Sequence, residues 1–554
     1  SFSSSSFYRS HQVQNRIQTP KRRKKRKILI RTNKNPHVLS IFKKATFTGR
    51  LFSFAVLHSP VDLIPLIPPI VALSLILITR QAALSLFSAI VAGAFLLAGP
   101  SPVLAVRCLF EDHLFPKIGE SSWHLSAIIF TFTLGAFATL LEKGGGFTTI
   151  LNRLLANKSQ DPKKKLLFGV YGLGLLCFFD GLANAALLGR VARPLTDSLR
   201  ISRQFLAYVI DSTSATVACV AFISTWIAVQ LSFIKQGLET ASFDVNPAAL
   251  FFNSIPANPY CLLSLILIPL VIFKAWQIGP MKNAKPVALD EKSEKSEANS
   301  PWLALLPLIV LVTALPAFIY FWQDGETWSW RNAFISDGVP YAMVAAGFIA
   351  LTTAYLCFPK NKRTDAPQHM LDGAASLFPA LIILICAWTL GSMFESLGTA
   401  DLLKTMLGDQ ISPMSVPLVI FLIGAVMSFM TGTSWGTFGL LMPMALPLVL
   451  KFGTDLPEDE LINLISMTIG AVFGGAVFGD HCSPFSDTTI VSALASGCSP
   501  TSHVATQLPY ALLAATGATI AYALMWIGLP AWLSTAILVA ALATIVLSRK
   551  TSTS

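Results

Sequence analysis

The sequence predicts an all-α polytopic membrane protein, with about 11–13 transmembrane segments in two inverted repeats, each holding a re-entrant hairpin and a broken helix. Composition is the first observation behind this prediction: 53% of the 554 residues are hydrophobic and 13% are charged, about half the charged share of a soluble domain. The second is that apolar residues gather in runs of about 20, the length that crosses a bilayer. The third is that some runs carry polar residues at their centres. A soluble multidomain enzyme and a disordered chain are therefore excluded.

The first 60 residues form a basic, Ser-rich leader whose composition differs from the rest. Residues 1–61 hold 14 of the 41 Lys and Arg and precede the first acid, Asp62, so the remainder has 27 basic and 29 acidic side chains. The net charge of +12 thus belongs to the leader and does not indicate a nucleic-acid partner. We expect the leader to be disordered or to serve targeting, because its composition is typical of an organelle transit peptide. A mis-set start of the reading frame is the alternative.

Thirteen apolar runs follow the leader, and a polar linker divides them. The linker covers 279–300, so the first transmembrane repeat is 61–278, the second is 301–547 and the tail is 548–554. The predicted runs are 63–79, 82–98, 123–141, 166–189, 204–231, 260–278, 302–322, 339–358, 374–397, 416–450, 461–496, 505–528 and 530–547.

Two of these runs are predicted to be re-entrant hairpins. Run 166–189 has Asp180 and Gly181 at its middle, and run 416–450 is too long for one span and has TGTSWGT at its middle. The loops flanking the first run carry nine Lys or Arg against two Asp, whereas those flanking the second carry two Lys against six acids. Because positive loops stay on the cytoplasmic side, the two hairpins enter the membrane from opposite faces. That arrangement is typical of inverted-repeat transporters.

The two halves also match in sequence. DGLANAALLGRVARPL, which begins at Asp180, and TSWGTFGLLMPMALPL, which begins at Thr433, share a polar start, two Leu and a final Pro-Leu without a gap. An interrupted span follows each of them. We expect Asp211 to mark the interruption in the first half, and Asp480 with Asp487 to mark it in the second.

The polar residues at membrane depth carry the predicted chemistry. An Asp at the centre of a membrane helix costs about 2.5–3.5 kcal/mol on insertion scales, so its presence indicates a functional site. Carboxylate, hydroxyl and exposed carbonyl oxygens together suit a hard cation. A buried carboxylate can hold either Na⁺ or H⁺, so alternating access would exchange the two, with Asp211 and Asp480 as the titrating pair. The predicted ion-binding and proton-coupling residues are Asp180, Asn184, Asp211, Ser212, Thr213, Thr433, Ser434, Asp480, His481, Ser483, Asp487 and Thr488.

Several motifs resemble the NhaC family of Na⁺/H⁺ antiporters, within the wider ion-transporter superfamily. They are FFDGLANAALLGRVARPLTD (178–197), ISRQFLAYVIDSTSA (201–215), ISTW (223–226), GDHCSPFSDTTIVS (479–492) and HVATQLPYAL (503–512). The resemblance covers about residues 62–547 and implies Na⁺ or Li⁺ exchange for H⁺. The family also includes exchangers of malate and lactate, so an ion-coupled organic-acid carrier on the same scaffold is the alternative.

Other readings of these residues stay open. Asp180 and Asp211 could pair with Arg190 or Arg203 at the neck of the hairpin. A zinc site or a nucleophile around His481 would support a membrane-embedded hydrolase, although the spacing fits neither pattern well. A bare channel would not need two acid-bearing broken helices. The eight cysteines form no CxxC pair and support no disulfide framework.

We expect no enzyme activity, no cofactor and no resident metal, since Na⁺ and H⁺ are the transported ions. The expected partners are membrane lipid and small inorganic cations, with an organic acid as the alternative substrate, no nucleic acid, and a homodimer left open. The expected location is a bacterial inner (plasma) membrane, with a plastid or mitochondrial membrane as the alternative.

Overall fold

The computed structural model describes residues 63–549 except 120–121, 157–159, 222, 241–244, 288–299, 322–337 and 408–411. Within these ranges every regular element is a helix. Nine of the helices are long and apolar enough to cross a membrane, or up to eleven if each of two bent helix pairs counts as one span. This confirms the predicted all-α membrane fold. The predicted leader, most of the predicted linker and the end of the tail lie outside the described residues.

The first described helices fold back on one another. α1 (Ile67–Thr79) and α2 (Ala82–Ala98) pack together, and α3 (Pro102–Arg107) leads through a π-helical turn (Cys108–Leu114) into α4 (Phe115–Gly119). The chain turns by 118° after α2, where Gly99 has a φ of +79° and Ser101 caps α3 by accepting from the Leu104 N–H. The sequence predicted no element between 99 and 122, because these short helices lack a full apolar run.

The first hairpin is observed where it was predicted. α7 (Pro162–Leu176) and α8 (Gly181–Ser198) are joined by a short turn that ends at Asp180, the N-cap of α8. α9 (Arg203–Val220) and α10 (Thr225–Thr240) follow, and the chain bends by 42° between them. We call α7 to α10 the first unit, residues 177–182 its tip and the interruption at residues 221 and 223–224 its break.

The second hairpin has the same layout. α19 (Val416–Thr431) ends at Gly432, and α20 (Ser434–Phe452) begins after its N-cap Thr433. α21 (Glu458–Cys482) and α22 (Asp487–Ser496) follow. We call α19 to α22 the second unit, residues 431–435 its tip and residues 483–486 its break. Gly432 has a φ of +69° and a side chain there would lie 2.8 Å from the backbone of Phe485, so the tip and break of this unit meet closely.

One predicted boundary is wrong. Asp211 does not mark a break, because α9 runs through it without interruption. The break comes ten residues later, and no Gly or Pro signals it. The carboxylate of Asp211 is satisfied by side chains from other helices, so the backbone has no need to open around it. The predicted order of hairpin then interrupted helix is otherwise observed in both units, while their opposite insertion stays a prediction.

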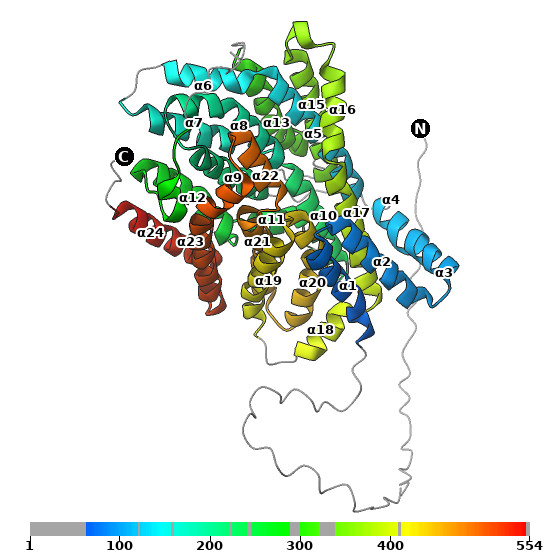
Figure 1. The fold of residues 1–554 in the computed structure, drawn as a ribbon. Coiled ribbons are helices and arrows are strands. Elements are labelled where there is room, and N and C mark those ends of the chain that lie inside the picture. The colour runs from blue at the N-terminus through cyan, green and yellow to red at the C-terminus, as the bar shows by residue number, and fades with distance from the viewer. Residues whose placement is uncertain are drawn as a thin grey trace, which may run out of the picture. The chain divides into compact units, whose positions relative to one another are not determined.

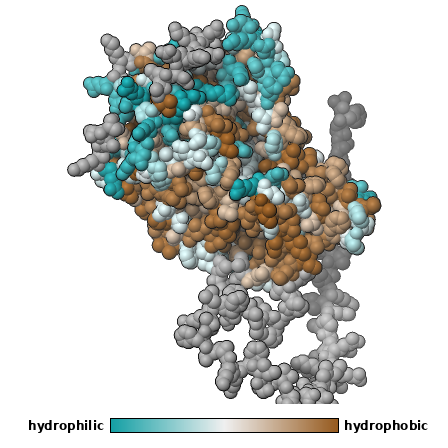
Figure 2. Space-filling view, in the orientation of Figure 1, coloured by the Kyte–Doolittle hydropathy of each residue, from teal (hydrophilic) through white to brown (hydrophobic). Residues whose placement is uncertain are grey.

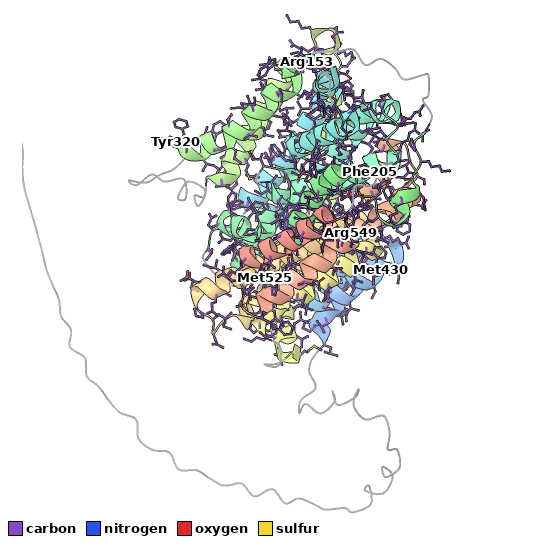
Figure 3. The ribbon with its side chains drawn as sticks, turned by 90° about the vertical axis from the view of Figure 1, so that its left-hand side faces the viewer. Arg153, Phe205, Tyr320, Met430, Met525 and Arg549 are labelled. Carbon is purple, nitrogen blue, oxygen red and sulfur yellow. The ribbon has the colours of Figure 1, made fainter. Side chains whose placement is uncertain are left out.

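The remaining helices pack around the two units (Figure 1). α5, α13, α15 and α16 pack as one group, α12, α23 and α24 as another, and α22 of the second unit packs on α8 and α9 of the first. Figure 3 shows Tyr320, at the end of α13, projecting away from the helices. The bounds of these surrounding helices are α5 Ser122–Gly144, α6 Gly146–Ala156, α11 Pro247–Ser254, α12 Pro259–Lys274, α13 Trp302–Phe321, α15 Val339–Cys357, α16 Ala366–Ser376, α17 Phe378–Ser396, α18 Thr399–Leu407, α23 Pro500–Trp526 and α24 Ala531–Leu547.

The surface agrees with a membrane location. In Figure 2 apolar side chains cover the lower part of the visible face, and hydrophilic ones gather towards the top. α19 exposes Val419, Leu422 and Val426, whereas α21 is buried along most of its length. An apolar outer surface around a core that holds polar groups is the arrangement that a lipid environment favours. The chain is therefore an integral membrane protein.

Candidate functional site

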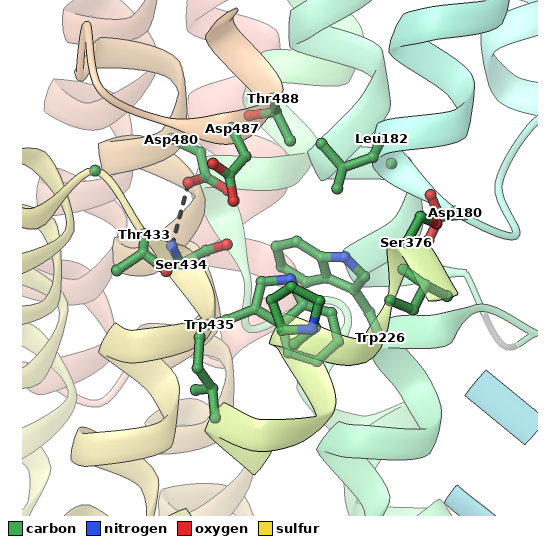
Figure 4. A pocket seen from close by; sticks show the side chains of 16 residues that line it. Asp180, Leu182, Trp226, Ser376, Thr433, Ser434, Trp435, Asp480, Asp487 and Thr488 are labelled. Carbon is green, nitrogen blue, oxygen red and sulfur yellow. Dashed lines mark hydrogen bonds between the residues drawn. The ribbon is translucent and has the colours of Figure 1, made fainter. Parts of the chain in front are cut away.

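A cavity of about 130 Å³ lies where both tips and both helix interruptions meet (Figure 4). The tip of the first unit contributes Asp180 to Leu182, and α10 contributes Trp226 just after the break. The tip of the second unit contributes residues 432–435. The cavity is completed by residues on both sides of the second break and by the junction of α16 and α17. The lining residues are Asp180, Gly181, Leu182, Trp226, Ser376, Leu377, Pro379, Ala380, Ile383, Gly432, Thr433, Ser434, Trp435, Asp480, Asp487 and Thr488.

Asp480 is the most buried acid of the second unit, with an exposed fraction of 2%. Its Oδ1 accepts hydrogen bonds from the Ser434 backbone N–H (3.2 Å) and the Ser486 hydroxyl (3.1 Å). Its Oδ2 has no hydrogen-bond partner among the described residues. Asp487, in the first turn of α22, lies beside it in Figure 4. One carboxylate oxygen of Asp480 is therefore available to a bound ion or proton.

Asp180 is bonded differently at the tip of the first unit. Its Oδ1 accepts from the Ala183 N–H (2.8 Å), which caps α8, and its Oδ2 accepts from the Thr225 hydroxyl (3.0 Å). The Thr225 N–H also donates to the Phe179 carbonyl (2.9 Å). The start of α10 is thus tied to the tip, and both carboxylate oxygens of Asp180 already have partners.

Two tryptophans also line the cavity, and no lining residue carries a positive charge. The indoles of Trp226 and Trp435 lie with ring centroids 6.0 Å apart, and Phe438 packs against both. None of the lining residues is Lys, Arg or His. The N-terminal ends of α8 and α20 border the cavity, and these ends carry partial positive charge. The wall thus combines three carboxylates with two helix N-termini.

Asp211 lies outside this cavity, in a buried polar network between α9, α22 and α23. Its Oδ1 accepts from the Ser492 hydroxyl (3.0 Å), and its Oδ2 accepts from the side-chain amide of Gln507 (2.6 Å). His503 Nε2 lies 3.2 Å from the same Oδ2, and the Thr489 hydroxyl lies 3.3 Å from it. All five side chains are buried. A charge at this depth is tolerated because so many donors converge on it.

Two side chains link this network to the backbone beside the cavity. The amide of Gln507 donates both to Asp211 and to the His481 carbonyl (2.9 Å). The Thr489 hydroxyl is within hydrogen-bonding distance of both Asp211 and the Asp480 carbonyl. His481 Nδ1 in turn lies 2.8 Å from the Tyr260 hydroxyl. The end of α21 that carries Asp480 is therefore held by the groups that also hold Asp211.

The twelve predicted residues fall into three sets. Six line the cavity: Asp180, Thr433, Ser434, Asp480, Asp487 and Thr488. Asp211 and His481 belong to the buried network or its link. The other four belong neither to the cavity wall nor to the buried network. Asn184 donates to the Gly174 carbonyl, and the Ser483 hydroxyl accepts from the Phe485 N–H. Ser212 and Thr213 are buried within α9, where the Thr213 hydroxyl donates to a carbonyl of its own helix.

The structure does not show the suggested pairings of Asp180 or Asp211 with arginine. Arg190 pairs with Glu142 (2.6 Å), and Arg203 pairs with Asp197 (2.9 Å). Sequence reasoning assigned no ion-binding role to the polar partners Thr225, Ser486, Thr489, Ser492, His503 and Gln507 or to Trp226. The spacing of His503 and Gln507, four residues apart on one predicted helix, would have placed them on one face.

Comparisons with known proteins identify the family of this chain. The model of the Na⁺/H⁺ antiporter family matches residues 217–527, a range that contains the second hairpin, both helix interruptions and α23. The chain belongs to the Na⁺/H⁺ antiporter family. This confirms the family that the sequence motifs indicated.

The chain is also similar in sequence to two bacterial proteins and in fold to a solved transporter structure. An uncharacterized protein of Haemophilus influenzae is 29% identical over 82% of this chain and 89% of its own length. The malate-2H⁺/Na⁺-lactate antiporter of Bacillus subtilis is 26% identical over 37% of this chain and 38% of its own. The fold is similar to the YdaH transporter of Alcanivorax borkumensis, with a TM-score of 0.54, 15% identity, and coverage of 81% and 99% of the two chains.

Proposed function

We propose that this antiporter exchanges Na⁺ or Li⁺ for H⁺ across a bacterial plasma membrane, and that the two ions compete for Asp480 in the cavity. The observation that carries the proposal is the unpartnered Oδ2 of Asp480, in a wall that also holds Asp180 and Asp487 and no basic side chain. The named relatives are bacterial proteins, which supports that location.

The burial of the Asp480 carboxylate explains why a cation and a proton would compete for it. A carboxylate removed from water costs several kcal/mol unless a proton, a cation or enough hydrogen bonds compensate it. Asp480 receives two hydrogen bonds on one oxygen and none on the other. A hard cation would find carboxylate and hydroxyl oxygens here, from Asp480, Asp487 and Thr488. A proton on Asp480 would remove the charge that holds the cation, so one ion leaves when the other binds.

The contacts between tip and break offer a way to alternate access. The Ser434 N–H at the tip of the second unit bonds to Asp480 just before the break. A change in the charge of Asp480 alters the strength of this bond, because a charged acceptor forms a stronger hydrogen bond than a neutral one. Asp211 would respond through Thr489 and Gln507, which connect it to the backbone of Asp480 and His481.

Exchange coupled to an organic acid is the second candidate. The N-terminal ends of α8 and α20 border the cavity, and such ends bind carboxylates. A cation held by Asp480 and Asp487 could accompany an anionic substrate held by those helix ends. The similarity to an antiporter named for malate and lactate favours this candidate over other substrates.

Proton movement in proteoliposomes that contain a pH-sensitive dye tests both candidates. We expect Na⁺ or Li⁺ alone to dissipate an imposed pH gradient, and Asp480→Asn to abolish this. Asp372→Asn is the matched control, because Asp372 is exposed, lies outside the cavity and accepts a hydrogen bond from Gln368 on its own helix. Dissipation that requires malate or lactate would favour the organic-acid exchanger. Dissipation by Asp480→Asn at the unaltered rate would contradict the cavity as the ion site.

A further inference from the structure

A second and larger cavity, of about 570 Å³, opens at one end of the first unit. The start of α7, the turn between α8 and α9, the end of α12 and the segment 275–286 form its wall. Its volume is within the range of ordinary small-molecule sites, about 300–1,000 Å³. Neither the ion cavity nor the Asp211 network shares a lining residue with it. It therefore calls for a separate explanation.

The wall of this cavity is strongly basic. Lys163, Lys164, Arg200 and Lys282 line it, against the single acid Asp161. Lys164 pairs with Asp161 at 3.4 Å. Lys163, Arg200 and Lys282 form no ion pair and no side-chain hydrogen bond with any residue that the structure describes. Three cations that form no ion pair among the described residues, around one hollow with a single acid, favour an anionic ligand.

A buried hydroxyl inside the cavity points in the same direction. Ser202 is 6% exposed, and its Oγ has no hydrogen-bond partner in the described part of the chain. Ser202 is the N-cap residue of α9, yet its side chain does not cap the helix. A donor at the positive end of an 18-residue helix is suited to a phosphate oxygen.

Arg200 also adopts an unusual backbone conformation. Its φ of +54° lies in the left-handed region, which costs a non-glycine residue free energy. The turn is held in place by hydrogen bonds from the N–H of Arg200 to the Asp197 backbone carbonyl (3.1 Å) and from the N–H of Ile201 to the Thr196 backbone carbonyl (2.9 Å). Arg200 lines the cavity in this conformation.

The surroundings of the cavity identify the kind of anion. α12 is one of the candidate membrane spans, and Phe273 near its end is 58% exposed, while Phe168 on α7 is 37% exposed. Lys164 Nζ lies 5.9 Å from the centroid of the Phe273 ring. A basic hollow beside an exposed apolar helix surface fits a molecule with a charged head and apolar chains. We propose that this cavity binds the phosphate group of an anionic membrane lipid.

The lipid would act on the turn between α8 and α9. Arg200 and Ser202 belong to that turn. α8 carries Asp180 at its start, and α9 carries Asp211. A bound phosphate would fix the end of the first unit and stabilise the folded protein.

Thermal unfolding of the purified full chain in detergent measures this binding without reference to transport. Short-chain phosphatidylglycerol is the probe, with phosphatidylcholine of the same chain length and inorganic phosphate as the two comparison ligands. We expect phosphatidylglycerol to raise the unfolding midpoint, and Lys163→Gln with Lys282→Gln to weaken its apparent affinity by at least about tenfold. Ser202→Ala should weaken it less. Lys285→Gln is the matched control, because Lys285 is exposed in the same segment and does not line the cavity.

Four outcomes would overturn the proposal. An equal response to phosphatidylcholine would mean that apolar contact alone is measured, and an equal response to inorganic phosphate would mean that the lipid chains play no part. Equal weakening by Lys285→Gln would mean that diffuse charge attracts the lipid. The fourth outcome concerns the acidic residues that follow the cavity segment in sequence, which are Asp290, Glu291, Glu294 and Glu297. Their amide variants and the double lysine variant are compared without added lipid. An equal fall of the unfolding midpoint in both would mean that this acidic segment, and not a lipid, binds the cavity.

Discussion

The two hairpin units share one layout but place their polar groups in opposite positions. In the first unit the carboxylate, Asp180, is the N-cap on the tip, and the hydroxyl, Thr225, follows the break. In the second unit the hydroxyl, Thr433, is the N-cap on the tip, and the carboxylate, Asp480, precedes the break. In the first unit two hydrogen bonds from Thr225, one from its hydroxyl and one from its N–H, join the start of α10 to the tip. In the second unit the Ser434 N–H at the tip donates to Asp480 at the end of α21.

The different bonding of Asp180 and Asp480 indicates which of the two acids is free to exchange ions. Both oxygens of Asp180 are bonded, one as a helix cap and one to Thr225. Asp480 has one bonded and one unpartnered oxygen. A residue whose hydrogen bonds are all satisfied within the protein mainly stabilises it, whereas a buried unsatisfied oxygen calls for a ligand. The first unit is thus the more fixed of the two, and the second is the one that we expect to respond to ions.

The largest expected effect is that of Asp480→Asn on transport. The amide oxygen can still accept from Ser434 and Ser486, so the fold should persist, while the charge that holds the cation is lost. We expect Na⁺-driven proton movement to be abolished, because an amide at this position neither exchanges a proton nor attracts the cation. Initial rates over a range of Na⁺ concentrations measure this. An unaltered rate would show that the asymmetry between the units does not concern the ion.

The next effect concerns stability, for which we expect Asp211 to matter more than Asp480. Asp211→Asn would place an amide among the donors Ser492, His503 and Gln507, and we expect it to reduce the free energy of unfolding by about 1–3 kcal/mol. Asp480→Asn should reduce it less, because the substitution removes a buried charge that is only half compensated. Unfolding midpoints of the two variants, compared in one detergent, give the order.

A smaller effect at the same site would separate charge from hydrogen bonding. Ser492→Ala removes one donor to Asp211 and keeps the charge. If Asp211→Asn destabilises the protein no more than Ser492→Ala does, the network stabilises the fold through ordinary hydrogen bonds rather than through its charge.

Much of this layout was predictable from the sequence. Asp180 and Thr433, the starts of the two matched segments, are both helix N-caps in the structure. The match was informative because an N-cap requires a polar residue before an apolar run, a purely local demand. The second interruption was also predictable, since Asp480 and Asp487 flank a segment with Ser and Pro.

The role of Asp211 could not be predicted because it depends on tertiary contacts. The sequence alone shows an Asp among hydroxyl residues within an apolar run, and such a pattern suits either a broken helix or a buried network. The groups that decide between the two, Thr489 and Gln507, lie 278 and 296 residues away along the chain. The true first break has Ser224, whose hydroxyl accepts from the Ile227 N–H, as its local signal.

A moderate effect is expected at Asp180, and its pattern across substitutions tests the fixed character of the first unit. Asp180→Asn should preserve the cap, because Asn and Asp cap helices about equally well, whereas Asp180→Ala should cost about 1 kcal/mol. Transport by Asp180→Asn should therefore stay close to that of the unaltered protein. Loss of transport in Asp180→Asn with an unaltered unfolding midpoint would instead place its charge in the ion site.

The smallest expected effect comes from the hydroxyls that hold each acid. Thr225→Val keeps the shape of the side chain and removes the donor to Asp180 Oδ2, and the loss of this one hydrogen bond should cost about 0.5–1.5 kcal/mol. Ser486→Ala removes one of two donors to Asp480 Oδ1, and the Ser434 N–H remains. We therefore expect Thr225→Val to lower the unfolding midpoint more, and Ser486→Ala to change the apparent Na⁺ affinity more. The hydroxyl that matters for ion binding should be bonded to the acid that exchanges ions. If Thr225→Val changes the apparent Na⁺ affinity more than Ser486→Ala does, the ion site therefore lies in the first unit and not in the second.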